Sequence, residues 1–180
     1  TRTDGELLIL HQHGKLLAIL AVHVDDLKMT GEKATLMMIV EQLEIVFGKL
    51  ILQWHRFTNC GIRHIQDPTT FEITLDQIEY AAALKTLEHP SIKGASLEAV
   101  IPSDLLEMFM SLRGAVVYCL LTRADVSVYV VFLQRQQPDT TTFRHIKMLN
   151  EVVKRLQRHP LKLHYKYLGP ETYFLVTVSY

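Results

Sequence analysis

The sequence predicts an α+β fold in which a β-rich first half is followed by a helical lobe and a last β-hairpin. In the first half, short runs of Leu, Ile and Val are separated by single glycines, as is typical of antiparallel strands. From residue 104 onward, apolar residues instead recur at intervals of three and four, which indicates amphipathic helices. The 180 residues are 48% hydrophobic and 21% charged, so the chain has enough apolar material for a packed core.

Two consecutive hairpins are predicted at the start of the chain. Residues 7–10 and 15–22 are apolar and flank Gly14, so they should pair across a short turn. Residues 27–31 then provide a return strand for the second run. The second hairpin would carry Asp25 and Asp26 near its tip.

The remaining elements up to residue 88 follow from the same apolar spacing and from turn residues. They are a helix over residues 32–47 closed by Gly48, strands over residues 56–66 and 71–75, and a helix from Asp76 to about residue 87. Residues 89–103 contain Pro90, Gly94 and Pro102 and are predicted to be a linker.

Three helices and a hairpin are expected after the linker. The predicted helices cover residues 104–121, 123–136 and 141–158, and the two strands of the hairpin cover residues 161–167 and 173–180. The domain prediction therefore has four parts: residues 1–88, the linker 89–103, a helical region 104–160 and a C-terminal β-hairpin 161–180.

The overall charge gives no sign of a polyanion partner, but the distribution of charge does. Lys and Arg total 19, as do Asp and Glu, so the formal net charge is zero. Between residues 144 and 166, however, seven Lys or Arg accompany a single acid, Glu151. A basic arm is therefore predicted within a neutral chain.

Cysteine usage and hydropathy bear on location. Cys60 and Cys119 form no CxxC pair, which favours a reducing compartment, and both are expected to be small apolar fillers. Trp54 is likewise expected to be a core or interface aromatic. No apolar run approaches the length that spans a bilayer. We therefore expect an intracellular protein, cytoplasmic or nuclear, without a membrane partner.

The adjacent carboxylates of Asp25 and Asp26 are costly between two apolar strands unless something neutralises them. Neighbouring strand residues point to opposite faces, so only a tight turn directs both side chains to one point. Two charges there repel each other and lose hydration, and a hard divalent cation such as Mg²⁺ or Mn²⁺ removes both penalties. Such ions support phosphoryl transfer. The competing interpretation is a solvated turn, because Asp is common in turns.

Several motifs occur along the chain in a characteristic order. They are LLAILAVHVDDL at residues 16–27, FTNCGI at 57–62, SLRGAVVY at 111–118, LTRADV at 121–126 and KRL at 154–156. This order resembles that of copia-type retrotransposon reverse transcriptases, which have a Tyr-Val-Asp-Asp turn, a Phe-Leu-Gly-Ile-like strand, Ser-Leu-x-Gly-x-x-x-Tyr, Thr-Arg-x-Asp-Ile and a basic thumb helix. The resemblance covers nearly the whole chain, and the ordered spacing is more specific than any one motif.

The resemblance implies a fragment of a Pol polyprotein. Residues 1–88 would be the second part of the reverse-transcriptase palm, followed by a thumb or connection region and a hairpin leading towards a missing ribonuclease H domain. The implied activity is that of an RNA-directed DNA polymerase, with Asp25 and Asp26 as catalytic ligands of Mg²⁺ or Mn²⁺. The implied partners are an RNA or DNA primer–template, deoxynucleotides and the rest of the polyprotein. Because the family's third carboxylate lies upstream, we expect the isolated chain to be inactive.

Other residues are candidates through the same resemblance. His23 stands where the family usually has Tyr and would be a neighbour of the primer end. Nucleic-acid contacts are expected from Arg63, Arg144, Lys147, Lys154, Arg155 and Arg158. The alternatives are an ordinary half-exposed strand around Arg63 and a solvated helix face for the others. The rival function is a decayed or repurposed module that binds nucleic acid or protein without catalysis, which His23 and the truncation favour.

Overall fold

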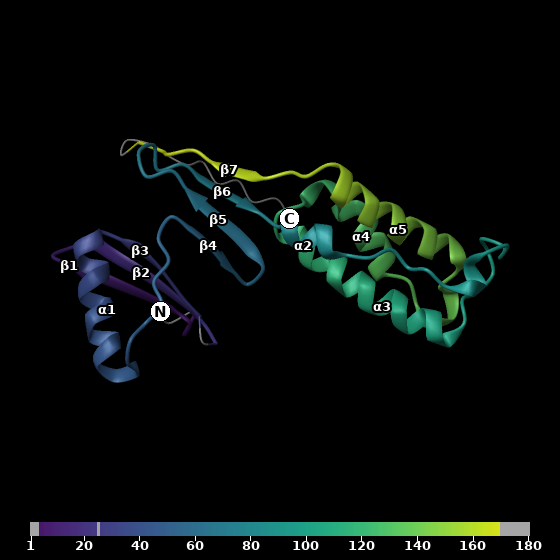
Figure 1. The fold of residues 1–180 in the computed structure, drawn as a ribbon, viewed down its shortest axis with the longest axis horizontal. Helices are drawn as coiled ribbons and strands as arrows, with labels where there is room; N and C mark the ends of the chain where they lie inside the picture. Colours follow the sequence, from purple (N-terminus) through teal and green to yellow (C-terminus); the bar gives the residue numbers. More distant parts are fainter. Residues whose placement is uncertain (1–3, 25, 170–180) are drawn as a thin grey trace. The chain divides into compact units, whose positions relative to one another are not determined.

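The computed structural model describes residues 4–24 and 26–169 and has a mixed α+β fold with antiparallel sheets (Figure 1). Those residues contain five α-helices. The chain divides into two compact units, the N-terminal unit (Thr1–Asn59) and the C-terminal unit (Cys60–Tyr180). The first boundary predicted from the sequence lies at residue 88 instead, and the assignment of the parts to a palm and a thumb remains a prediction.

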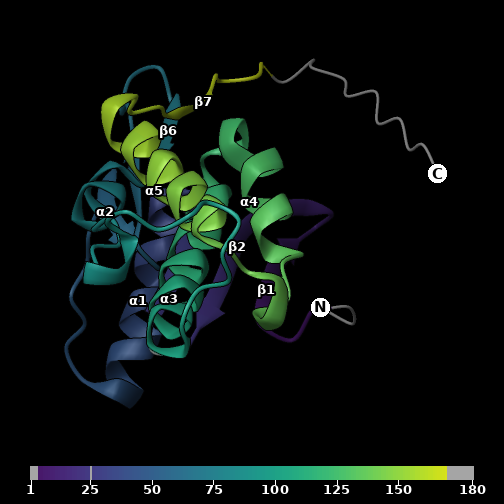
Figure 2. The ribbon, with the colours of Figure 1, turned by 90° about the vertical axis from the view of Figure 1, so that its right-hand side faces the viewer.

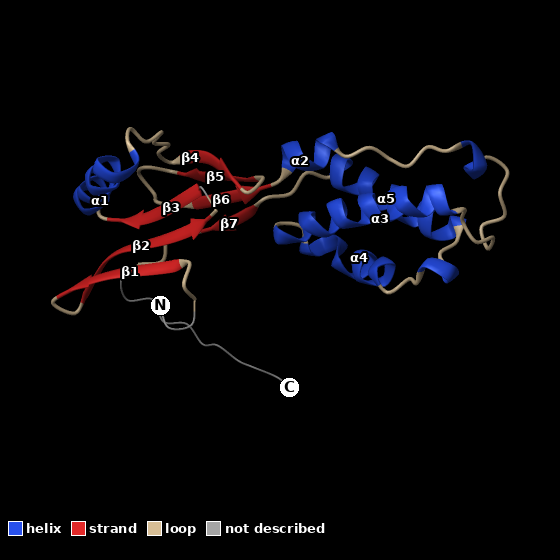
Figure 3. Cartoon of the chain, turned by 90° about the horizontal axis from the view of Figure 1, so that it is seen from below, coloured by secondary structure: helices blue, strands red, loops and turns tan. Residues whose placement is uncertain are grey.

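The N-terminal unit contains a three-stranded antiparallel sheet and one long helix (Figure 3). Its elements are β1 (Leu7–Gln12), β2 (Lys15–His23), β3 (Asp26–Gly31), α1 (Lys33–Phe47) and β4 (Arg56–Asn59). The sheet has the order β1-β2-β3. Gly48 closes α1 by donating its N–H to the Glu44 carbonyl oxygen over 3.0 Å. The two predicted hairpins, the first helix and its glycine cap are confirmed.

The core of this unit is small and lies between the sheet and α1. Ala18 and Leu20 of β2 are buried there with Leu36 of α1. Gly31 ends β3 with a φ of 156°, and a Cβ at this position would collide with the carbonyl oxygen of Leu17. Only glycine can therefore occupy the point where the chain leaves the sheet for α1.

The strands of the C-terminal unit correct one prediction. They are β5 (Ile62–Gln66), β6 (Ile73–Asp76) and β7 (Leu163–Tyr165), paired in that order. The single strand predicted over residues 56–66 is wrong, because left-handed φ values of 46° at Cys60 and 65° at Gly61 interrupt it. The Tyr118 hydroxyl donates a hydrogen bond to the Cys60 carbonyl oxygen and so holds this turn.

The first strand of the C-terminal hairpin predicted over residues 161–180 is present as β7, which pairs with β6. Ile73 lies opposite Tyr165, and Leu75 lies opposite Leu163. The second strand predicted for that hairpin, residues 173–180, lies outside the described residues.

The helix predicted from Asp76 to residue 87 is shorter than expected. α2 covers Ile78–Ala83 with Gln77 at its N-cap, so Asp76, which was expected to cap the helix, lies one residue earlier. Its Oδ1 accepts the N–H of Ile78 over 3.2 Å. Beyond α2, Asn150 accepts the N–H of Leu87 over 2.7 Å and donates to its carbonyl oxygen over 3.0 Å. These bonds hold the chain away from the helical conformation.

The three predicted helices of the helical region are confirmed, with breaks near Thr122 and Pro138. They are α3 (Ser103–Tyr118), α4 (Ser127–Gln134) and α5 (Phe143–Arg158), which pack together side by side (Figure 2). Phe109, Leu133 and Leu149 are fully buried between them. Cys119 is buried as well, and burial raises the pKa of its thiol to about 11, so it is a neutral filler as expected.

The segment predicted as a linker, residues 89–103, is held against the start of α5. Its Ile101 is buried and donates its N–H to the Thr141 carbonyl oxygen over 3.0 Å. The N–H groups of Phe143 and Arg144, in the first turn of α5, donate to carbonyl oxygens of the same segment. Within residues 4–24 and 26–169, no helix is both long enough and apolar enough for a bilayer.

Candidate functional site

The candidate metal ligands lie at the tip of the β2–β3 hairpin. His23 ends β2 and pairs with Asp26, the first residue of β3, so only two residues of the sequence separate them. Directly opposite residues of an antiparallel pair share one face, which places the side chains of His23 and Asp26 together. Asp26 is exposed. Asp25 lies outside the described residues, so its role as a ligand stays a prediction.

Val24 gives this turn a strained backbone. Its φ is 54°, and the residue is 88% exposed. A β-branched residue rarely adopts the left-handed conformation, and strain of this kind concentrates at functional sites. The backbone at Val24 is therefore compatible with the tight turn predicted for this hairpin tip.

Asp26 also borders a groove of about 310 Å³ in the N-terminal unit. The groove lies along β3, and its lining includes Lys28, Met29, Leu36, Trp54, Phe57 and Asn59. Asn59 donates a hydrogen bond from Nδ2 to Oδ2 of Asp26 over 3.4 Å. The carboxylate therefore lines a groove whose surface is both polar and apolar.

The described residues fit a divalent cation only in part. The carboxylate of Asp26 and the amide of Asn59 offer the hard oxygen ligands that Mg²⁺ and Mn²⁺ prefer. Among the residues that the structure describes, however, no three His, Cys, Asp or Glu side chains are grouped closely enough to hold a metal ion. Further ligands, Asp25 among them, would be needed.

Three of the predicted nucleic-acid contacts form a row on α5. Lys147, Lys154 and Arg158, here called the α5 stripe, are spaced by seven and four residues and so share one face. Glu151 lies within the row and accepts a hydrogen bond from Lys154 Nζ over 2.8 Å. That bond lowers the pKa of Glu151, and the charges of Arg158 and Lys147 lower it further. Three cations and one acid leave the row with two surplus positive charges.

Arg144 and Arg155, the other two candidates on α5, are paired with acids. Arg144 Nε donates to Glu98 Oε1 over 2.9 Å, and Arg155 Nε donates to Asp125 Oδ2 over 3.4 Å. The arginine side chains are 57% and 52% exposed. Exposed pairs of this kind are weak and do not prevent contact with a phosphate.

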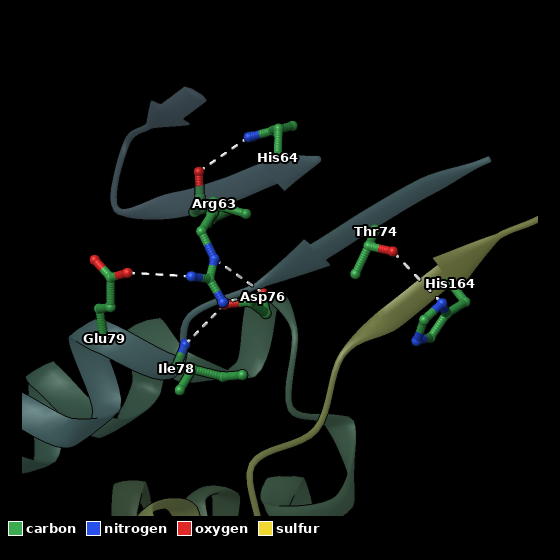
Figure 4. A network of polar contacts seen from close by, with 8 residues as sticks. Arg63, His64, Thr74, Asp76, Ile78, Glu79 and His164 are labelled. Atoms are coloured by element: carbon green, nitrogen blue, oxygen red, sulfur yellow. Dashed lines mark hydrogen bonds and ion pairs between the residues drawn. The ribbon is translucent and has the colours of Figure 1, made fainter. Parts of the chain in front are cut away.

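Arg63 belongs to a polar network on β5 (Figure 4). Its Nε and one terminal nitrogen donate to Oδ2 of buried Asp76 over 3.2 and 3.0 Å, and the other terminal nitrogen donates to Glu79 over 3.1 Å. The hydrogen bond to Asp76 raises the pKa of Arg63. Arg63 thus joins β5, β6 and α2, a structural role that explains its presence without a nucleic acid.

No family model, curated protein or solved structure matches the chain.

Three residues that line the same groove as Asp26 were not among the sequence candidates. Lys28 follows Asp26 by two positions, so strand alternation alone would have placed it on the same face. Trp54, expected in a core or interface, is 40% exposed and lines the groove. Asn59 is 33 residues from Asp26, and no local pattern indicates their contact.

Proposed function

We propose that the chain is a fragment of an RNA-directed DNA polymerase of a copia-type retrotransposon, inactive by itself. The observation that carries the proposal is the hairpin tip. Asp26 is exposed at the start of β3, opposite His23 and close to Val24, whose backbone has a left-handed φ. The order of motifs along the chain supports the same function.

Asp25 and Asp26 would hold Mg²⁺ or Mn²⁺, with at least one further carboxylate. When bound, such ions activate an attacking hydroxyl and stabilise the leaving oxygen in phosphoryl transfer. His23 shares the face of Asp26 and would lie beside the primer end. The α5 stripe would contact the phosphate backbone, which requires no base-specific geometry.

Metal binding is expected to depend on the aspartate pair. Calorimetric titration of the complete chain with Mn²⁺ should show saturable binding. The double substitution Asp25→Asn plus Asp26→Asn should weaken it at least about tenfold, because two carboxylate ligands become neutral amides. Asp139→Asn, at an exposed position of the C-terminal unit, is the matched control and should leave the isotherm unchanged. An identical isotherm for the double variant would show that the pair is an ordinary solvated turn.

Binding of nucleic acid is expected to depend on the α5 stripe and on salt. Replacing all three residues of the α5 stripe by alanine should make the plot of log binding constant against log salt concentration less steep for duplex DNA. The magnitude of the slope should fall by about 2–3, because each phosphate contact contributes about 0.9. Gel shifts at increasing NaCl concentration measure the slope. Lys49, Lys85 and Lys93, three exposed lysines outside α5, provide a control triple of equal charge. An equal loss of slope in both triples would mean that α5 has no special role.

A non-catalytic module that binds nucleic acid or protein is the second candidate. The incomplete set of metal ligands among the described residues favours it, as does His23 in place of the family's Tyr. It predicts salt-sensitive DNA binding without Mn²⁺ binding by the aspartate pair. The two titrations above therefore separate the candidates.

A further inference from the structure

A serine, a histidine and an aspartate are joined by hydrogen bonds where residues 89–91 meet the first turn of α3. Ser91 Oγ lies 2.6 Å from His89 Nδ1, and His89 Nε2 lies 3.1 Å from Asp104 Oδ2. All three residues belong to the C-terminal unit. A nucleophile bonded to a base, with the base oriented by a third group, is the arrangement that activates a serine hydroxyl.

Pro90 sets the backbone that places the ring of His89 beside Ser91. The residue before a proline is restricted to extended conformations, and His89 has a φ of −149° and a ψ of 144°. Pro90 then begins a 3₁₀ turn over Pro90–Ile92, and the side chain of His89 caps this turn. The base and the nucleophile are therefore brought together by local structure.

The hydrogen bonds of His89 determine which ring nitrogen carries the proton. The backbone N–H of Ser91 can only donate, and it donates to His89 Nδ1 over 3.3 Å. Nδ1 must therefore present its lone pair, and the Ser91 hydroxyl donates to the same atom. The proton of the neutral ring lies on Nε2, which donates to the carboxylate of Asp104. In this tautomer, His89 can accept a proton from Ser91.

The surroundings of the serine limit the kind of reagent that it can attack. Ser91 is half-buried, the His89 side chain is partly exposed and Asp104 is exposed, so a small molecule can approach from solvent. The backbone N–H groups of residues 91–93 already donate to acceptors within the turn. They are not available to stabilise an oxyanion. The reagent must therefore be activated by a leaving group that is a weak base.

We propose that Ser91 is an acyl-acceptor site for activated esters, with His89 as its general base and Asp104 as the residue that positions the imidazole. Ser91 Oγ bonds to the ester carbonyl carbon while its proton passes to His89 Nδ1. The bond from that carbon to the leaving oxygen then breaks, and the leaving group takes the proton from Nδ1. Asp104 stabilises the imidazolium between the two transfers. The acyl group remains on Ser91.

This site is independent of the proposed polymerase function, and p-nitrophenyl acetate tests it on the complete chain. The rate of acetylation at each serine is measured by mass spectrometry of peptides. Ser91 should react at least about a hundredfold faster than Ser96, an exposed serine of the same segment, because a general base contributes about 10²–10⁴-fold. Equal rates at the two serines would overturn the proposal.

Replacement of His89 by asparagine separates catalysis from a structural role. Asparagine is a favourable N-cap residue, so in His89→Asn it can accept the N–H of Ser91 and keep the turn, but its amide is not a base. Acetylation of Ser91 should fall at least about a hundredfold, whereas acetylation of Ser96 in the same sample should not change. Undiminished acetylation of Ser91 would show that His89 only caps the turn.

The role of Asp104 is tested by Asp104→Asn. Loss of one charged hydrogen-bond partner should slow the acetylation of Ser91 about tenfold. In the natural chain the rate should fall in acid, as His89 gains a proton. In the variant this fall should move to lower pH, because a neutral amide stabilises the protonated ring less than a carboxylate does. An unchanged pH profile would show that Asp104 does not act on the imidazole.

Discussion

Replacing Phe109 with alanine is expected to lower the free energy of unfolding of the C-terminal unit by about 3–5 kcal/mol. Phe109 of α3 is 0% exposed and belongs to the main core cluster together with Leu149 and Val153 of α5. Its loss removes apolar contacts and leaves a cavity that the three surrounding helices cannot close completely. Urea unfolding followed by circular dichroism at a helical wavelength measures the change.

Met110, the next residue of α3, provides the matched control. It is 41% exposed, so Met110→Ala should change the free energy of unfolding by only about 0.5 kcal/mol. Similar losses for both variants would mean that Phe109 is not at the centre of the core. The Phe109 variant should also bind DNA less well, because the α5 stripe depends on the packing of α5.

Replacing Asp125 with alanine is expected to destabilise the same unit by about 3–5 kcal/mol, because it leaves a buried charge without its partner. Arg123 is 4% exposed, and it donates to Asp125 Oδ1 over 2.8 Å and to Oδ2 over 3.0 Å. Its remaining terminal nitrogen donates to the Leu156 carbonyl oxygen over 3.2 Å. Asp125 therefore neutralises a guanidinium that ties the turn before α4 to the end of α5.

A double substitution tests this explanation directly. Arg123→Met plus Asp125→Ala removes both charges and should cost less than Asp125→Ala alone, because no unpaired ion remains in the interior. Asp139→Ala, at an exposed site, should be nearly neutral. If the double variant is less stable than the single one, the hydrogen bond from Arg123 to Leu156 is the more important contact.

The effect of Asp125 should also depend on pH. Hydrogen bonds from Arg123, followed by its charge and that of Arg155, lower the pKa of Asp125 in the folded chain. A carboxyl group whose pKa is lowered by folding stabilises the protein above its unfolded pKa, and this contribution is lost as the pH falls through the folded pKa. The difference in stability between the natural chain and Asp125→Ala should therefore narrow in acid.

Elements with strong local periodicity were predicted well from the sequence. The hairpins β1–β2 and β2–β3 have apolar strand-forming runs joined by short turns, and α5 has apolar residues at helical spacing. The position of Asp26 at the hairpin tip follows from the same pattern. These features depend on residues that are close together in the chain, so a sequence pattern records them directly.

The predicted bounds of strands and helices were wrong where residues far apart in the chain determine the backbone conformation. Tyr118 holds the Cys60 turn inside a segment that resembles one continuous strand. Asn150 occupies both backbone groups of Leu87 from 63 positions away, where helical spacing predicted a longer α2. No local pattern contains such contacts, because tertiary hydrogen bonds outweigh the small differences in intrinsic propensity.

The α+β order, the paired hairpins with Asp26 at the tip and the three helices of the C-terminal unit could all be predicted from the amino-acid sequence. The pairing of β7 with β6, the ion pairs of Arg63 with Asp76 and Glu79, and the groove beside Asp26 became visible in the folded chain alone. The two groups of features differ in the sequence separation of the residues that produce them. Periodicity of two or 3.6 residues specifies which face of an element is buried, whereas the partner of that face is set by packing between segments far apart in the chain.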